Sequence, residues 1–426
     1  MDFLKTTDQD FAAKFSALVN NRRESRVDVS VAVQEIIANV KVRGDEAIRE
    51  YTSCFDNHSP TSFGLSQKAI TYYAQQCSAD ITTALEFAAE RITAFHQKQV
   101  PQNFVYTDSV GVNLSLNWVP LSTVGIYVPG GRASYPSSVL MNALPAKIAG
   151  VRRIIMTVPT PNGKINPAVL AAAQVAGITE IYCIGGAQAI AALAYGTASI
   201  APVDKIIGPG NAYVTEAKRQ VHGTVGIDNI AGPSEILVVA DDKNNPERIA
   251  WDLLSQAEHD PCAQSILITD SIDFAQTVID SIAGILPCLS TRKVADASWK
   301  EHGAVIVVDN LDASIPLVNQ LAPEHLELCV DDPHQLAQHI RCAGSIFLGR
   351  YTPEAIGDYV GGPNHVLPTA RSARFSSGLS IYDFMKRITY LECGKQSLQK
   401  IGKAAVILAE AEGLPAHARS ISTRLQ

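Results

Sequence analysis

The feature that most constrains this chain is a regular alternation of short apolar segments and helical segments that begins near residue 121. Residues 123–128, 153–158 and 180–184 are apolar, a glycine or a proline follows each of them, and a helical stretch comes next. Parallel strands joined by crossover helices need short, buried segments of this kind. The same alternation returns between residues 235 and 349. The sequence therefore predicts an α/β fold with two Rossmann-like parallel-sheet units.

The segments outside this alternation are predicted to be helical. We expect residues 1–25 to form an N-terminal helical arm and residues 381–426 a C-terminal helical tail. Residues 127–235 form one predicted α/β domain, and residues 26–126 together with 236–380 form the other. The helical segment 27–100 has an apolar stripe and is expected to pack on the second unit. This stripe consists of Val31, Val33, Ile36, Ile37 and Val40.

The composition limits the classes of partner. The 426 residues include 35 Lys and Arg against 42 Asp and Glu, with no basic block, so a nucleic-acid partner is not expected. The N-terminus has acids where a secretory signal has a basic run, and no apolar run is long enough to span a bilayer. We therefore expect a cytoplasmic protein with no membrane partner. Charged residues make up only 18%, which favours an oligomer with buried subunit surface.

Three glycine-rich turns follow predicted strands of the first unit, at residues 127–131, 184–188 and 207–211. Open parallel sheets bind ligands beyond the carboxyl ends of their strands, and the amides of the helices that follow can accept a phosphate. None of the turns has the GxGxxG or GxxxxGK spacing, so the usual dinucleotide fingerprint and the P-loop are absent. A single turn of this kind is ordinary strand-to-helix geometry. Three in one sheet favour a nucleotide-sized ligand.

Two pairs of side chains could carry chemistry. Gln256 and His259 are three residues apart in a predicted helix, so they share a face and could hold one metal ion. The alternative is a plain helix C-terminus, and glutamine is a poor ligand beside histidine or carboxylate. Glu324 and His325 are adjacent in a helix-to-strand connection, where an imidazole suits a general base and the acid can orient it or activate water. The alternative is an ordinary surface pair.

Two further segments offer polar side chains in unusual places. Residues 350–369 form a long loop rich in glycine and proline that nevertheless offers Asp358, Asn364 and His365. Near the C-terminus, Glu412 and His417 flank a predicted helix start at residue 415. A histidine so close to the end of a chain is more often solvated than functional.

Taken together, these motifs resemble the histidinol dehydrogenase family over almost the whole chain. The resemblance rests on IYVPGG (126–131), GGAQAIAALAYGT (185–197), DKIIGPGNAYVTEAKRQV (204–221), AGPSEILV (231–238), DLLSQAEH (252–259), APEHLEL (322–328), GDYVGGPNHVLPT (357–369), ARFSSGLS (373–380) and EGLPAHARSI (412–421). One local departure is Asp260-Pro261-Cys262, where the family often has Gly-Pro-Asp.

The resemblance implies a zinc-dependent, NAD-linked oxidation of L-histidinol through L-histidinaldehyde to L-histidine, the last steps of histidine biosynthesis. It implies that His325 is the general base and that Glu324 activates water for the second oxidation. The implied ligands of one zinc ion are Gln256, His259, Asp358 and His417. These four residues and His325 would also bind substrate, together with Ser234, His365 and Glu412. The implied NAD contacts are Tyr127, Gln188 and Asn211.

The family also implies a homodimer in which the C-terminal tail of one subunit reaches the site of its partner. Glu412 and His417 would then complete the partner's substrate and zinc pocket. An apolar stripe in the tail needs a partner and fits this arrangement; it consists of Leu398, Ile401, Ala405 and Leu408.

Three alternatives remain open at this point. The first is a thiol-dependent aldehyde dehydrogenase with Cys329 or Cys262 as its nucleophile, although neither has clear activating neighbours in the sequence. The second is a non-catalytic protein that binds a small ligand on the same scaffold. The third is a relative of the family that oxidises another small polar alcohol, such as a sulfonated propanediol.

Overall fold

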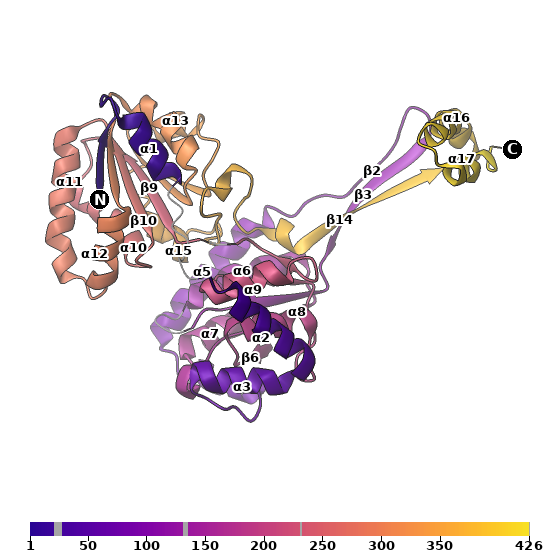
Figure 1. Cartoon of the computed structure of the whole chain (residues 1–426), viewed down its shortest axis with the longest axis horizontal. Helices are drawn as coiled ribbons and strands as arrows, with labels where there is room; N and C mark the ends of the chain where they lie inside the picture. The colour runs from indigo at the N-terminus through magenta and orange to yellow at the C-terminus, as the bar shows by residue number, and fades with distance from the viewer. Residues whose placement is uncertain (21–27, 131–134, 231, 426) are drawn as a thin grey trace.

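Two parallel β-sheets and a projecting antiparallel arm make up the chain (Figure 1). The computed structural model describes residues 1–20, 28–130, 135–230 and 232–425. The predicted α/β fold with two parallel-sheet units is confirmed. Gly131, at the end of the first glycine-rich turn, and residues 21–25 of the predicted N-terminal arm lie outside the described residues.

The larger sheet has six parallel strands. In spatial order they are β1 (Asp2–Lys5), β11 (Ala304–Val307), β10 (Gln264–Thr269), β9 (Glu235–Ala240), β12 (His325–Cys329) and β13 (Ser345–Leu348). The helices of this unit are α1 (Phe11–Asn20), α10 (Pro246–Ala257), α11 (Ile272–Ile285), α12 (Arg292–His302), α13 (Ser314–Leu321), α14 (Pro333–Ala337) and α15 (Glu354–Tyr359). Apolar residues of β9 and β10 point to both faces and are fully buried, as strands covered on both sides require.

The smaller sheet has five parallel strands. In spatial order they are β6 (Glu180–Tyr182), β5 (Arg153–Thr157), β4 (Thr123–Tyr127), β7 (Lys205–Ile207) and β8 (Gly226–Ile227). Its helices are α2 (Ser30–Arg43), α3 (Asp45–Asp56), α4 (Gln67–Ala74), α5 (Ala79–Gln97), α6 (Pro136–Ala149), α7 (Pro167–Ala176), α8 (Gly186–Tyr195) and α9 (Ala212–Val221). The crossover helices α7 and α8 are almost wholly buried, because α2 to α5 form a further layer over them.

The expected packing of residues 27–100 on the second unit is wrong. Val33, Ile36, Ile37 and Val40 share a core with α8 and α9 of the five-stranded unit, whereas Val31 is exposed. An apolar stripe predicts that one face of a helix is buried, but it does not predict which of the two sheets the helix packs on. The predicted domain division joined residues 26–126 to the other unit, whereas α2 to α5 pack on the five-stranded unit.

The two ends of the chain also differ from the prediction. The N-terminal segment is only partly helical, because β1 pairs with β11 and forms one edge of the six-stranded sheet before α1 (Phe11–Asn20) begins. The C-terminal segment begins as a strand, β14 (Met385–Cys393), and only then continues into α16 (Lys395–Ala411) and α17 (Pro415–Ser422). The tail is therefore only partly helical.

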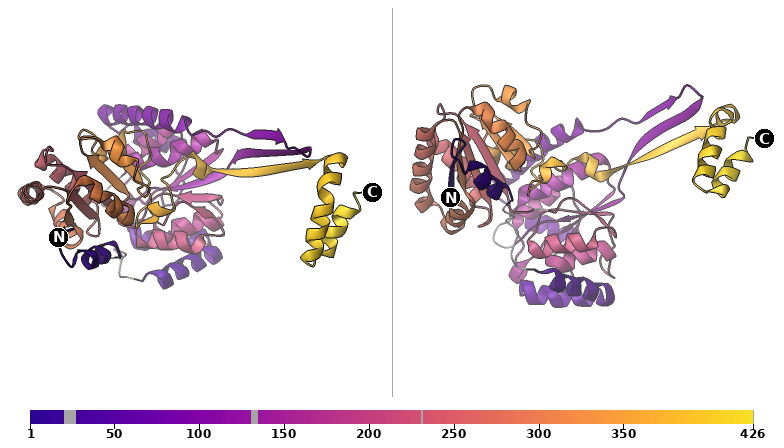
Figure 2. Two further views of the ribbon diagram at one scale, coloured as in Figure 1. Left: turned by 90° about the horizontal axis from the view of Figure 1, so that it is seen from above. Right: turned by 45° about the horizontal axis from the view of Figure 1, so that its top comes forward.

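An antiparallel sheet of three strands forms the projecting arm. Strand β14 pairs along its whole length with β3 (Val112–Pro120), and β2 (Phe104–Thr107) pairs with the other side of β3. All views place α16 and α17 at the far end of this arm, away from both α/β units (Figure 2). Among the described helices, none is both long enough and apolar enough to cross a membrane.

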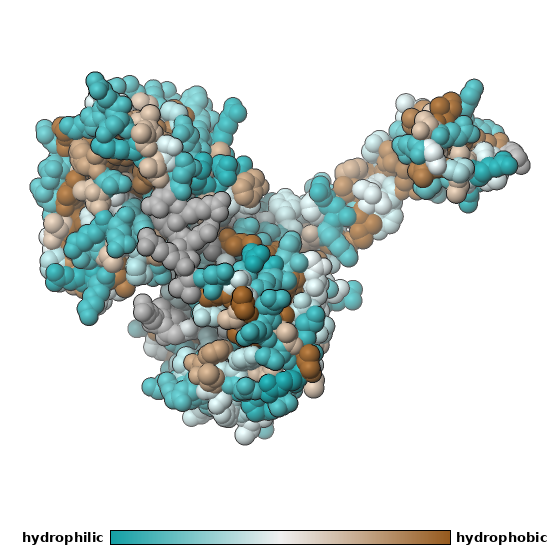
Figure 3. Space-filling model, in the orientation of Figure 1, coloured by the Kyte–Doolittle hydropathy of each residue, from teal (hydrophilic) through white to brown (hydrophobic). Residues whose placement is uncertain are grey.

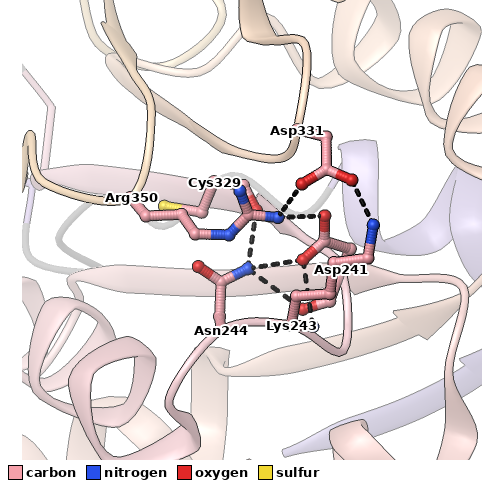
Figure 4. A network of polar contacts seen from close by, with 6 residues as sticks. All are labelled: Asp241, Lys243, Asn244, Cys329, Asp331 and Arg350. Carbon is pink, nitrogen blue, oxygen red and sulfur yellow. Dashed lines mark hydrogen bonds and ion pairs between the residues drawn. The ribbon is translucent and has the colours of Figure 1, made fainter.

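A polar network ties together the carboxyl ends of β9, β12 and β13 (Figure 4). The Arg350 guanidinium binds the carboxylates of Asp241 and Asp331, and Lys243 pairs with Asp331. The Asn244 amide donates to the Cys329 carbonyl at 2.7 Å. Arg350 follows β13 directly, so the network fixes the start of the loop that leads to α15.

A candidate active site at the amino edge of the six-stranded sheet

Glu324 and His325 lie where α13 gives way to β12. The helix ends at Ala322 in the left-handed conformation (φ 48°), and Pro323 prevents it from continuing. His325 is the first residue of β12 and pairs with Ile236 of β9, so both side chains lie at the amino edge of the sheet. Each is about 95% buried. The alternative of an ordinary surface pair is therefore excluded.

The backbone of one residue of β9, Glu235, orients both side chains through the peptide groups on its two sides. The amide of Glu235 donates to Glu324 Oε2 at 2.9 Å, and its carbonyl accepts from His325 Nδ1 at 2.9 Å. A carbonyl oxygen can only accept, so Nδ1 carries the ring proton. The Nε2 atom of a neutral His325 therefore presents a lone pair, which is what a general base requires.

Burial sets the protonation of this pair. It lowers the pKa of His325 to about 4, so the ring is neutral near pH 7. Burial also raises the pKa of Glu324 well above its ordinary value, and the nearby Glu235 carboxylate adds to this effect. A carboxylate with a raised pKa is a stronger base than one in water. This property suits a side chain that activates a water molecule.

Helix α15 brings two more carboxyl groups to the pair. Glu354 Oε1 lies 3.4 Å from His325 Nε2, and burial raises the pKa of Glu354 to about 9. Asp358 is one helical turn further on. The helix approaches β13 closely because Gly357 has no side chain; a Cβ there would lie 2.6 Å from the Phe347 ring. Sequence reasoning missed Glu354, although its spacing of four residues from Asp358 was a usable signal.

Three imidazoles face Asp358. His365 Nδ1 lies 3.5 Å from Asp358 Oδ1 and also donates to the Asp358 carbonyl at 3.0 Å. Burial opposes the charge of Asp358, but the hydrogen bond from His365 and the imidazoles of His325 and His259 outweigh burial and lower its pKa. His365 Nε2 lies 3.3 Å from Ser138 Oγ of α6, so this histidine also joins the two α/β units.

Gln256 is in α10, which packs against α15, and His259 follows two residues after the end of α10. The Gln256 side chain is 1% exposed, and its Oε1 atom has no hydrogen-bond partner within the part of the chain that the structure describes. His259 lies just beyond the end of the helix and is exposed. A buried amide oxygen without a partner is costly, so the Gln256 oxygen is available to a metal ion.

These side chains fit a metal ion. Ligand atoms of His325, Glu354 and Asp358 all lie within 4.8 Å of one another. This set shares only Asp358 with the predicted ligands, and the unsatisfied Gln256 oxygen favours the predicted set. The predicted ligands are Gln256, His259, Asp358 and His417. A mixed set of imidazole nitrogen and carboxylate or amide oxygen is typical of a metal that keeps open positions for a substrate.

The remaining predicted substrate residues divide into two groups. Ser234 is half-buried and directly precedes Glu235, the residue whose backbone holds the catalytic candidates. Glu412 and His417 are exposed and lie at the far end of the arm (Figures 1 and 2). A single chain therefore does not bring these two residues to the site.

The three predicted NAD residues lie at one edge of the five-stranded sheet. Tyr127 ends β4, Gln188 is in the first turn of α8, and Asn211 caps α9. Tyr127 is buried, its hydroxyl oxygen accepts from the Gly186 amide at 3.1 Å, and burial raises its pKa to about 12. Gln188 is also buried and its Oε1 atom lacks a partner among the described residues. Asn211 is exposed.

Cys329 is poorly supported as a nucleophile. Cys329 is buried in β12, and burial, followed by the neighbouring acids Glu327 and Asp252, raises the pKa of its thiol. A thiol that resists ionisation is a weak nucleophile.

The fold and site define an α/β enzyme with a buried acid–imidazole pair beside a candidate metal site. The sequence model of the histidinol dehydrogenase family matches residues 19–425. The chain is 72% identical to histidinol dehydrogenase 1 of Trichormus variabilis and 58% identical to histidinol dehydrogenase of Rhodospirillum rubrum, in both cases over 99% of this chain and 98% of the relative. The crystal structure of histidinol dehydrogenase from Elizabethkingia anophelis superposes with a TM-score of 0.95 at 37% identity, covering 100% of this chain and 98% of that one.

The chain therefore belongs to the histidinol dehydrogenase family and is an oxidoreductase of histidine biosynthesis. This confirms the resemblance drawn from the sequence motifs. It also excludes the non-catalytic alternative.

The lowered pKa of His325 predicts how stability depends on pH. In the metal-free protein, the unfolded state binds more protons than the folded state between about pH 6.5 and pH 4, so the free energy of unfolding falls as the pH falls through this range. Between pH 7 and pH 5 the His325 contribution amounts to about 2 kcal/mol. Denaturant unfolding at both pH values should show the wild-type protein losing more stability than His325→Asn. Equal losses in the two proteins would contradict the prediction.

Proposed function

We propose that this protein catalyses the zinc-dependent, NAD-linked oxidation of L-histidinol through L-histidinaldehyde to L-histidine. The observation that carries the proposal is the fixed tautomer of His325, whose Nε2 lone pair faces the metal-binding side chains while Glu324 lies beside it. Membership of the family supports the choice of substrate.

Zinc would be held by Gln256, His259 and Asp358 of one subunit and by His417 of the partner subunit. When bound, zinc supplies open coordination positions for the imidazole and amino nitrogens of histidinol, which orient the alcohol carbon. Ser234 and His365 of the same subunit would surround the rest of the substrate, together with Glu412 of the partner subunit. The unsatisfied Gln256 oxygen supports this assignment, because a metal would satisfy it.

His325 would accept the proton of the substrate hydroxyl at Nε2, while the Glu235 carbonyl holds Nδ1 and keeps the ring in place. Glu324 would activate water to hydrate the aldehyde, and its raised pKa makes it a competent base for this step. NAD, when bound, supplies the hydride acceptor for each oxidation, and two molecules are consumed per histidine. Tyr127, Gln188 and Asn211 would form its binding edge.

The arm supports a homodimer with shared sites, and we propose that this homodimer is cytoplasmic because the family carries out histidine biosynthesis. Side chains on the arm and at its tip expose large apolar surface, as Figure 3 shows. They include Val105, Leu391, Ile407, Leu408 and Leu414, each at least 40% exposed. A partner subunit that covers this surface would receive Glu412 and His417 at its own site.

The direct test is a zinc-replete assay that counts NADH formed per L-histidinol consumed. We expect two NADH per substrate and no free aldehyde. His325→Asn should lower kcat by roughly 10²- to 10⁴-fold, because it removes the general base. One NADH per substrate, or turnover only with another polar alcohol such as a sulfonated propanediol, would contradict the proposal.

Gln256→Leu should separate stability from metal binding. The change removes a buried oxygen without a partner, so the metal-free protein should gain about 1 kcal/mol in the free energy of unfolding, while its affinity for zinc falls. Denaturant unfolding after chelation and a zinc titration measure the two effects. Gln188→Leu is the matched control: it removes a similar oxygen in the other unit and should leave zinc affinity unchanged. Unchanged zinc affinity in Gln256→Leu would remove this residue from the ligand set.

Mixed dimers test whether sites are shared. His417→Ala and His259→Ala should each be inactive alone, but a heterodimer of the two contains one intact site, built from His259 of one chain and His417 of the other. Refolding the two variants together in equal amounts should therefore recover about one quarter of the wild-type activity if chains pair at random. A mixture that stays inactive would show that each site is built within one subunit.

A further inference from the structure

A buried ion pair lies behind the predicted NAD edge of the five-stranded sheet. Lys218 is on α9 and Asp228 follows β8, and each side chain is 4% exposed. Among the Lys and Arg ion pairs in the described part of the chain, both partners are buried to this extent only here. Removing two charges from water is expensive and often adds nothing to stability, so such a pair calls for another explanation.

Lys218 and Asp228 bind the carbonyl and the amide of Gly208, respectively. The Gly208 amide donates to Asp228 Oδ2 at 2.8 Å, and the Gly208 carbonyl accepts from Lys218 Nζ at 3.0 Å. Asp228 is itself tied to β7, because its amide donates to the Ile206 carbonyl at 3.2 Å. The two charged side chains therefore fix the peptide groups on both sides of Gly208.

Gly208 starts the turn that leads from β7 to α9. Its φ of +113° is open to glycine alone, and a Cβ there would lie 2.1 Å from the Tyr127 carbonyl oxygen. At the other end of the turn, Asn211 Oδ1 accepts from the amides of Tyr213 and Val214, both at 3.1 Å. The turn from Gly208 to Asn211 is thus anchored at both ends and presses against the last residue of β4.

We propose that Lys218 and Asp228 are positioning residues that hold the Gly208–Asn211 turn in the shape that receives NAD. The proposal rests on the NAD edge proposed above. The chain lacks the GxGxxG spacing that normally shapes a dinucleotide-binding turn. Here the charge-assisted hydrogen bonds of Lys218 and Asp228 to the Gly208 backbone fix the shape of the turn. A pre-organised turn binds more tightly because less ordering remains to be done on binding. The pair should therefore govern affinity for the cofactor and leave the chemical step alone.

The test uses the double variant Lys218→Met with Asp228→Asn. A single substitution would leave one buried charge without its partner, whereas the double variant removes both charges and keeps an acceptor for the Gly208 amide. The matched control is Arg153→Met with Glu180→Gln. This pair joins the first residues of β5 and β6 at the opposite edge of the same sheet, with Arg153 Nε 2.8 Å from Glu180 Oε2.

We expect the double variant to raise the KM for NAD about tenfold and to weaken NADH binding by a similar factor in a fluorescence titration. Its kcat at saturating NAD and its KM for histidinol should stay within twofold of wild type. The control should keep the wild-type KM for NAD even if its melting temperature falls. A folded double variant with an unchanged KM for NAD would overturn the proposal.

If the double variant does not fold, Asp228→Glu provides the second test. It keeps the charge but lengthens the side chain by one methylene, which displaces the Gly208 amide, so the KM for NAD should again rise. An unchanged KM in this folded variant would also overturn the proposal. NADH titration of the wild-type protein needs no turnover. NADH binding that depends on the pair in a protein inactive on histidinol would refute the proposed substrate and uphold the positioning role.

Discussion

The candidate active site depends on the backbone of a single residue, Glu235, at the start of β9. The Glu235 amide holds the Glu324 carboxyl group, and the Glu235 carbonyl holds the His325 ring. A strand in the middle of a buried parallel sheet is the most rigid support that the fold offers, so the acid and the imidazole keep their relative orientation without help from a ligand. The same contact assigns the ring proton to Nδ1 and leaves a lone pair on Nε2, the atom proposed as the base.

Much of this arrangement could be predicted from the sequence. The apolar segments that became β4, β5, β9 and β10 are short, buried and separated by helices, and periodicity alone identifies such elements well. The catalytic candidates Glu324 and His325 also stood out, because an acid and an imidazole directly follow a helix-stopping proline. Gln256 was a weak candidate on spacing alone. Its unsatisfied, buried oxygen is a property of the folded chain that no spacing rule contains.

Other features depend on contacts between distant segments and were missed for that reason. Strand β3 alternates apolar and polar residues from Val112 to Trp118, which was a usable strand signal, but the buried-strand pattern of the two parallel sheets does not include it. The rule that parallel sheets bind ligands at their carboxyl edges led to the NAD contacts proposed for the five-stranded sheet. It does not describe His325, which lies at the amino edge of the other sheet, while the carboxyl edge there holds the Arg350 network.

The arm has a consequence for how this protein can vary. Because β14 is hydrogen-bonded to β3 along all nine of its residues, the distance from the two α/β units to α17 is set by strand length, about 30 Å at 3.3 Å per residue. A flexible linker could gain or lose residues with little effect on its reach, but the length of a paired strand fixes the distance that it spans. Residues on the arm can be substituted without changing its length, whereas an insertion in β14 must be matched by an insertion in β3 to keep the strand register. Length in this region should therefore be inherited more strictly than sequence.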